Sequence, residues 1–145
     1  MIDFEVNQQA GKKISAKFWK KTFSTINKVL KLKAKVKVSV GIVGTAQMKK
    51  FNKAYRGKDK VTDVLSFGEQ DGVEQSRIND GEYLGEIIIC YSEALRKAKI
   101  TRCSLDDELK LLTVHGFLHL LGYDHIKNSQ AAEMEALEDR ILRLQ

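Results

Sequence analysis

All three histidines of the chain lie in one short stretch, HGFLHLLGYDH, residues 115–125. His115 and His119 are four residues apart, so on a helix their imidazoles project from the same face, one turn apart. Gly122 can adopt the left-handed conformation that ends a helix and reverses the chain, which would bring His125 back to the same place. Three neutral imidazoles leave the fourth tetrahedral position of a zinc ion for water, which is typical of catalytic sites. The spacing therefore predicts a catalytic metal centre.

The same stretch also resembles a known protease pattern, with one difference. H-x3-H-x5-H, with glycine three residues after the second histidine, matches the metzincin pattern HExxHxxGxxH at every other position. Gly116 stands where the metalloproteases carry the glutamate that acts as general base, which argues against peptide hydrolysis by that mechanism. Three imidazoles suit several transition ions, so nickel or another ion remains an alternative to zinc. Asp124 can orient a ligating imidazole or form a local hydrogen bond in the turn.

A second group of chemically capable residues lies in NKAYRGKDKVTDVLSF, residues 52–67. Arg56 stands at the end of a predicted helix, and a guanidinium can bind a phosphate through two parallel hydrogen bonds and stabilise developing charge. An arginine at a helix C-terminus can equally serve only to complement the helix dipole. Asp63 can bond the Arg56 side chain or shape the turn before a strand. Both alternatives stay open for each residue.

Charge is distributed unevenly along the 145 residues, whose net charge is +6. Residues 1–60 contain 16 Lys and Arg against 3 acidic residues, whereas residues 61–145 contain 9 against 16. A basic half opposite an acidic half can attract phosphates to one face, although solvated lysines on exposed helices explain the same pattern.

Residue patterns along the chain predict one α+β domain spanning residues 1–145, with no linker or repeat. Strands are predicted at 2–6, 35–43, 62–67 and 84–91. Helices are predicted from Ser15 as N-cap, from Thr45 as cap to near Gly57, from Ser92, from Ser104, and from about Ser129 to Leu144. The helix that carries the first two histidines is apolar on nearly every side, which predicts that it is buried.

Other features indicate a soluble, cytoplasmic protein without a membrane segment. The first residues lack the apolar core of a signal peptide, and no apolar run approaches the roughly 18 residues that span a bilayer. Cys90 and Cys103 have no CxxC spacing, so both are predicted to be reduced and buried.

HGFLHLLGYDH, NKAYRGKDKVTDVLSF and YLGEIIIC together closely resemble the YbeY family of bacterial metal-dependent endoribonucleases and ribosomal RNA maturation factors. The resemblance runs from about Val36 to the C-terminus. It implies a small mixed sheet of four strands packed with about five helices, including a zincin-like metal helix. It also implies action on single-stranded RNA and association with ribosome maturation.

Carried over residue by residue, the resemblance implies that His115, His119 and His125 bind zinc and that Arg56 is the functional arginine. Three positions depart from the family pattern. The family usually has proline where Val61 and Gly68 stand, and aspartate where Glu86 stands. The first two changes affect the stiffness of the loops. The third keeps the negative charge but changes how far the carboxylate extends from the strand. The candidates for contacts that support the metal ligands are Asp63, Glu86 and Asp124.

The favoured hypothesis is a zinc-dependent, single-strand-specific endoribonuclease that acts in ribosomal RNA maturation and ribosome quality control. Either a metal-bound water or the RNA 2′-hydroxyl could attack the phosphate. Because Gly116 removes the usual base, the ion itself, Asp124 or Glu86 would assist. The alternative is a non-catalytic assembly factor that binds ribosomal RNA or a ribosomal protein and uses the metal for structure. A zinc peptidase is the least favoured hypothesis.

Overall fold

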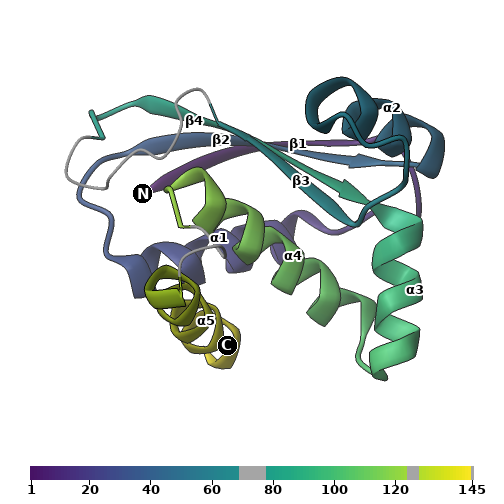
Figure 1. Ribbon diagram of the computed structural model, residues 1–145. Helices are drawn as coiled ribbons and strands as arrows, with labels where there is room; N and C mark the ends of the chain where they lie inside the picture. Colours follow the sequence, from purple (N-terminus) through teal and green to yellow (C-terminus); the bar gives the residue numbers. More distant parts are fainter. Residues whose placement is uncertain (69–77, 124–127, 145) are drawn as a thin grey trace.

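The computed structural model describes residues 1–68, 78–123 and 128–144, which form a mixed four-stranded sheet and five helices (Figure 1). The strands are β1 (Ile2–Gln8), β2 (Val36–Val43), β3 (Val64–Gly68) and β4 (Glu82–Cys90). The helices are α1 (Ala16–Leu30), α2 (Thr45–Arg56), α3 (Tyr91–Thr101), α4 (Leu105–Leu120) and α5 (Asn128–Arg143). The predicted α+β class, with its small mixed sheet, is confirmed. None of the helices in these residues is long and apolar enough to cross a membrane.

The strand order is β1-β2-β4-β3, which places β3 at an edge of the sheet. β1, β2 and β4 run parallel, and β3 pairs antiparallel with β4. Parallel neighbours need a crossover connection, and α1 provides it between β1 and β2. The edge strand β3 follows directly after the segment that carries Arg56, so this arginine lies near the edge of the sheet.

Helices cover the two faces of the sheet unequally (Figure 1). α1 and α4 lie against one face, where the larger apolar cluster includes Phe23, Ile87 and Phe117, and α5 packs against these two helices. α2 lies against the opposite face, where a smaller cluster includes Met48 and Ile88. Because neighbouring residues of a strand point to opposite faces, Ile87 and Ile88 of β4 belong to different clusters.

The histidine-bearing helix α4 is buried, as its apolar composition predicts. Ser104 caps its N-terminus, where the hydroxyl accepts a hydrogen bond from the Asp107 amide at 3.0 Å. Gly116 lies where the helix meets the sheet: a Cβ atom there would be 2.7 Å from Cγ2 of Ile87 and 3.2 Å from Oγ of Ser66. The absence of a side chain at Gly116 therefore lets α4 approach β3 and β4 closely.

Three details of the sequence prediction are wrong. Thr45 is the first residue of α2 rather than its cap, because the extended residue before it, Gly44, occupies the N-cap position. β4 runs directly into α3, so that helix begins after Cys90 and Ser92 lies inside it. Cys103 is exposed, because it follows the end of α3 in the short turn to α4, whereas Cys90 is buried as predicted.

Candidate active site

His115 and His119 project from the same face of α4, and their Nε2 atoms are 3.1 Å apart. Two nitrogens bound to one tetrahedral zinc ion at about 2.0–2.1 Å would be separated by about 3.3–3.4 Å. The observed separation is close to this value, so the two imidazoles fit a shared metal ion. The ring centroids are 4.7 Å apart with an interplanar angle of 71°. The four-residue spacing thus brings both potential ligand atoms to one point.

Glu138 of α5 fixes the orientation of the first histidine. Its Oε1 lies 2.6 Å from Nδ1 of His115, and the side chain of each residue is mostly buried, at 25% exposure for His115 and 13% for Glu138. An ionised carboxylate only accepts hydrogen bonds, so Nδ1 carries the proton and donates it. Nε2 is then the other ring nitrogen of His115, and it is the atom that faces His119. Metal-ligating histidines commonly have a carboxylate partner of this kind.

Gly122 adopts a left-handed backbone conformation with φ 96°, and its amide donates to the carbonyl of His119 at 2.9 Å. The predicted left-handed glycine therefore does follow the end of α4. His125 and Asp124 lie outside the described residues. Among the residues that are described, no group of three or more potential metal ligands is found. The predicted third ligand thus stays a prediction, and His115 and His119 form the described part of the centre.

Ser66 links the arginine-bearing helix end to α4. An Nη atom of Arg56 donates to the carbonyl oxygen of Ser66 at 3.5 Å, and the hydroxyl of Ser66 donates to the carbonyl oxygen of Gly116 at 3.1 Å. Gly116 is the immediate neighbour of His115. Arg56 is exposed, so most of its five N–H donors face solvent at the edge of the sheet. The structure therefore brings the predicted arginine to the strand that contacts the histidine helix.

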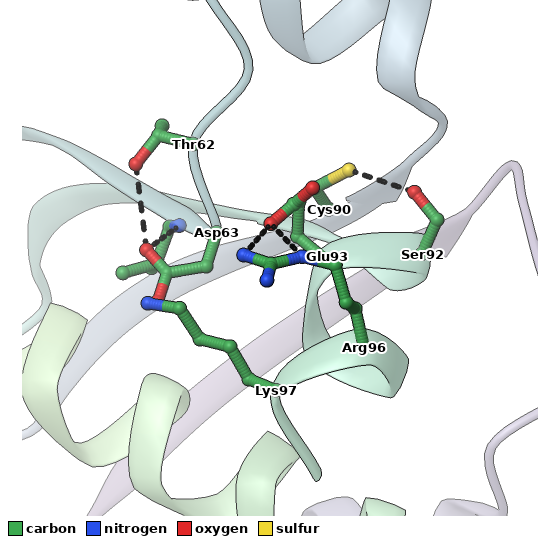
Figure 2. A network of polar contacts seen from close by, with 8 residues as sticks. Thr62, Asp63, Cys90, Ser92, Glu93, Arg96 and Lys97 are labelled. Carbon is green, nitrogen blue, oxygen red and sulfur yellow. Dashed lines mark hydrogen bonds and ion pairs between the residues drawn. The ribbon is translucent and has the colours of Figure 1, made fainter. Parts of the chain in front are cut away.

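Asp63 is held by Lys97, whereas the sequence suggests Arg56 as its partner. Its Oδ2 forms an ion pair with Nζ of Lys97 at 2.5 Å, and its Oδ1 accepts from the amide of Val64 at 2.8 Å (Figure 2). Figure 2 also shows Thr62 directed at the same carboxylate. These contacts tie the start of β3 to α3. Asp63 thus shapes the entry to the edge strand, whereas Arg56 bonds to Ser66.

Glu86 lies on the other side of the sheet from the histidines. It is two residues from Ile88, which belongs to the cluster under α2, and next to Ile87, which faces Gly116 of α4. Side chains alternate along a strand, so Glu86 shares the α2 face. This position separates Glu86 from His115 and His119 by the thickness of the sheet.

Glu108 is a buried acid in the first turn of α4, with 6% exposure. Burial raises the pKa of its carboxyl above the ordinary value, Lys97 opposes this shift, and Asp63 adds to it. The junction of β3, α3 and α4 therefore contains one cation, Lys97, that acts on both acids.

Two residues of the site were not identified from the sequence. Ser66 lies in a predicted strand, and its hydroxyl is recognisable as a link only once α4 is packed against β3. Glu138 lies on α5, and one acid among several on an amphipathic helix gives no signal of its own. A search for a carboxylate on the same helix face as the buried Met134 and Ile141 would have selected it, because Glu138 lies one turn from each.

Comparison with known proteins is consistent with this arrangement. Residues 2–144 match the family model described as endoribonuclease YbeY. A protein named endoribonuclease YbeY from Moorella thermoacetica is 42% identical over 147 residues, covering 94% of this chain and 92% of its own length. Its namesake from Bacillus licheniformis is 47% identical over 109 residues, covering 72% of this chain and 69% of its own. The solution structure of TM1509 from Thermotoga maritima has a TM-score of 0.65 at 26% identity, covering 98% of this chain and 87% of that one.

Proposed function

This chain belongs to the YbeY family of endoribonucleases, and we propose that it is a zinc-dependent endoribonuclease that cleaves single-stranded RNA. We further propose, from the family resemblance, that it acts in the cytoplasm on ribosomal RNA during ribosome maturation and quality control, in contact with ribosomal proteins. The observation that carries the proposal is the convergence of the His115 and His119 Nε2 atoms at 3.1 Å on a helix tied to Arg56 through Ser66.

His115 and His119, together with His125, would hold the ion. A bound zinc ion would lower the pKa of a coordinated water and offset negative charge on the scissile phosphate. Glu138 would keep His115 in the tautomer that presents Nε2, and the packing of α4 against the sheet would keep both rings in place. The chain would thus supply a rigid, pre-oriented pair of ligands.

Arg56 would bind the phosphate beside the metal centre. Its guanidinium is planar, permanently charged and exposed at the β3 edge, and its fork of donors matches two phosphate oxygens. The bond to Ser66 uses only part of its donor capacity, at the long distance of 3.5 Å. Arg56 can therefore turn toward an incoming phosphate without breaking a strong interaction.

The geometry of Gly116 disfavours a peptidase. A glutamate at this position would have to fit where a single Cβ atom already comes within 2.7 Å of the buried Ile87 side chain. The position that carries the general base in HExxH proteases is therefore directed into the sheet in this protein.

The proposed function is tested by incubating zinc-loaded protein with three substrates: a single-stranded RNA, a blunt RNA duplex of the same sequence, and casein. We expect cleavage of the single strand, much slower cleavage of the duplex and no casein turnover, with all RNA cleavage lost in His119→Ala. Zinc-loaded wild-type protein that binds RNA without cleaving it would overturn the nuclease proposal and support the non-catalytic assembly factor. Casein turnover that depends on His115 would support the peptidase.

A further inference from the structure

Three aromatic rings gather where α2 crosses β3, and we call Phe51, Tyr55 and Phe67 the aromatic cluster. The Tyr55 and Phe67 ring centroids are 4.8 Å apart, and Phe51 lies 6.3 Å from Tyr55 and 6.4 Å from Phe67. Phe51 and Phe67 are half-buried, whereas Tyr55 is 66% exposed. Phe67 thus contacts the Tyr55 ring at an interplanar angle of 50°, while much of the Tyr55 ring is open to solvent.

This exposure differs from what the sequence pattern predicts. Helical spacing places Tyr55 on the same side of α2 as Met48, Phe51 and Asn52, and Met48 and Asn52 are indeed buried. Tyr55 lies one turn beyond Phe51, in the last turn of α2, and is exposed there. An exposed aromatic residue contributes little to stability by burial, since most of its apolar surface remains in water. Its place in the fold does not explain the choice of a large aromatic ring.

The aromatic cluster lies beside the phosphate-binding candidate. Arg56 directly follows Tyr55, and it donates to the carbonyl of Ser66, the neighbour of Phe67. Alternation along β3 directs the Ser66 side chain toward Gly116 of α4 and the Phe67 side chain toward α2. The edge strand therefore has the aromatic cluster on one face and the histidine helix on the other, with Arg56 between them.

The surroundings of the aromatic cluster are strongly basic. Between residues 49 and 60 the chain carries a single acid, Asp59, and six exposed cations: Lys49, Lys50, Lys53, Arg56, Lys58 and Lys60. Lys49 pairs with Asp59 at 3.9 Å, a long contact between two exposed groups. An apolar ring platform within a cationic surface is the combination that binds single-stranded nucleic acid, because the bases stack on the rings and the backbone is neutralised by the cations.

We propose that the aromatic cluster is a stacking platform for one unpaired base of the RNA, next to the phosphate that Arg56 binds. This inference rests on the proposed function and names how that site selects its substrate. Stacking uses the face of a base, so it tolerates any of the four bases, and it requires a base that is not already stacked in a duplex. The platform therefore favours single strands without reading sequence.

The test measures binding of an eight-nucleotide RNA by fluorescence anisotropy, at one fixed salt concentration, with His119→Ala protein to prevent cleavage. Tyr55 is replaced by Ala, Leu or Phe. Because position 55 is exposed on a helix, Ala is tolerated well there. We expect Tyr55→Ala and Tyr55→Leu to weaken binding about 5- to 100-fold and Tyr55→Phe to bind within about twofold of the parent. Tyr83→Ala, at the other exposed tyrosine of the described residues, is the matched control and should bind like the parent.

A second measurement identifies the base. One abasic nucleotide is placed at each RNA position in turn, and the loss of affinity is compared between the parent and Tyr55→Ala. At one position the abasic substitution should weaken binding by the parent but have little further effect on Tyr55→Ala, since both changes remove the same contact.

The platform is overturned if Tyr55→Leu binds the RNA as tightly as the parent. That result would indicate that any apolar side chain at position 55 is sufficient and that no base stacks on the ring. The platform is also overturned if the loss of affinity from Tyr55→Ala and the loss from the abasic nucleotide are additive at every RNA position. Neither result bears on RNA cleavage by the wild-type protein. That cleavage is the separate test of the proposed function. A wild-type protein that cleaves no RNA would remove the proposed function regardless of how Tyr55 behaves.

Discussion

Nδ1 of His115 lies 2.6 Å from Oε1 of Glu138, so a carboxylate from the last helix orients an imidazole of the metal helix. The contact joins α4 to α5 at the point where the two Nε2 atoms converge. It therefore connects the packing of the C-terminal helix to the geometry of the candidate metal centre, and it gives α5 a role beyond covering the core.

Replacing Glu138 by glutamine should weaken zinc binding about 10- to 100-fold while the fold stays intact. Glutamine has a similar size, but its neutral amide holds the His115 ring less firmly and makes it a weaker ligand. Competition with a fluorescent zinc chelator measures the affinity, and circular dichroism checks the fold. Glu135→Gln, at an exposed position one turn away on α5, is the control. Equal zinc affinity in the Glu138 and Glu135 variants would contradict a supporting role for Glu138.

Arg56→Ala should lower kcat/KM for single-stranded RNA by about 100-fold or more, because it removes the donors aimed at the scissile phosphate. The kcat/KM of Arg56→Lys should lie between those of the wild type and Arg56→Ala, since an ammonium keeps the charge but loses the planar fork of donors. Cleavage of an end-labelled RNA under single-turnover conditions measures the effect. Arg143→Ala, at an exposed arginine near the end of α5, controls for net charge. A loss of similar size in Arg143→Ala would mean that charge alone is responsible.

Gly116→Ala should lower the free energy of unfolding by about 1–2 kcal/mol, because the added methyl group overpacks the interface between α4 and β4. The methyl would lie 2.7 Å from Cγ2 of Ile87, a branched and fully buried side chain that cannot rotate away. This cost exceeds the gain in helix propensity from replacing glycine. Urea denaturation gives the free energy, and a variant as stable as the wild type would contradict the close contact.

The buried acid Glu108 makes stability depend on pH. Since burial raises its pKa in the folded protein above the ordinary 4.5, the folded state binds this proton more tightly than the unfolded state does. The resulting stabilisation is complete below about pH 4.5 and is lost as the pH rises through the folded-state pKa. Glu108→Gln has no proton to lose, so its stability relative to wild type should increase over this interval.

Urea denaturation at a series of pH values tests the effect of Glu108. Asp106→Asn serves as the control because it removes a charge from the same turn at an exposed position. A stability difference between Glu108→Gln and wild type that does not change with pH would show that the carboxyl is not titrating differently in the folded state.

The sequence predicted well those features that depend on local spacing. The four-residue interval between His115 and His119 sets their shared face. Ser15 caps its helix as predicted, and the helix predicted from Ser104 begins there. Strand positions were predicted to within about two residues, because alternation and β-branched residues reflect the pleat directly. The left-handed Gly122 was predicted for the same kind of reason, since few other residues tolerate that conformation.

Features that depend on tertiary packing could not be read in this way. Asp63 faces Lys97 because α3 lies beside the start of β3, and 34 residues of chain separate the two. Glu138 meets His115 across 23 residues, and the exposure of Tyr55 depends on what packs against the last turn of α2. Pattern reasoning identifies faces of helices and strands, but it does not say which faces meet.

The central claim, RNA cleavage at a zinc centre held by the α4 histidines, is tested most directly by titrating zinc into metal-stripped protein while following cleavage of a single-stranded RNA. Activity should rise with added zinc and saturate near one equivalent per chain, and His119→Ala should stay at background throughout. RNA cleavage by His119→Ala at the wild-type rate, or a fully zinc-loaded wild-type protein without activity, would contradict the account.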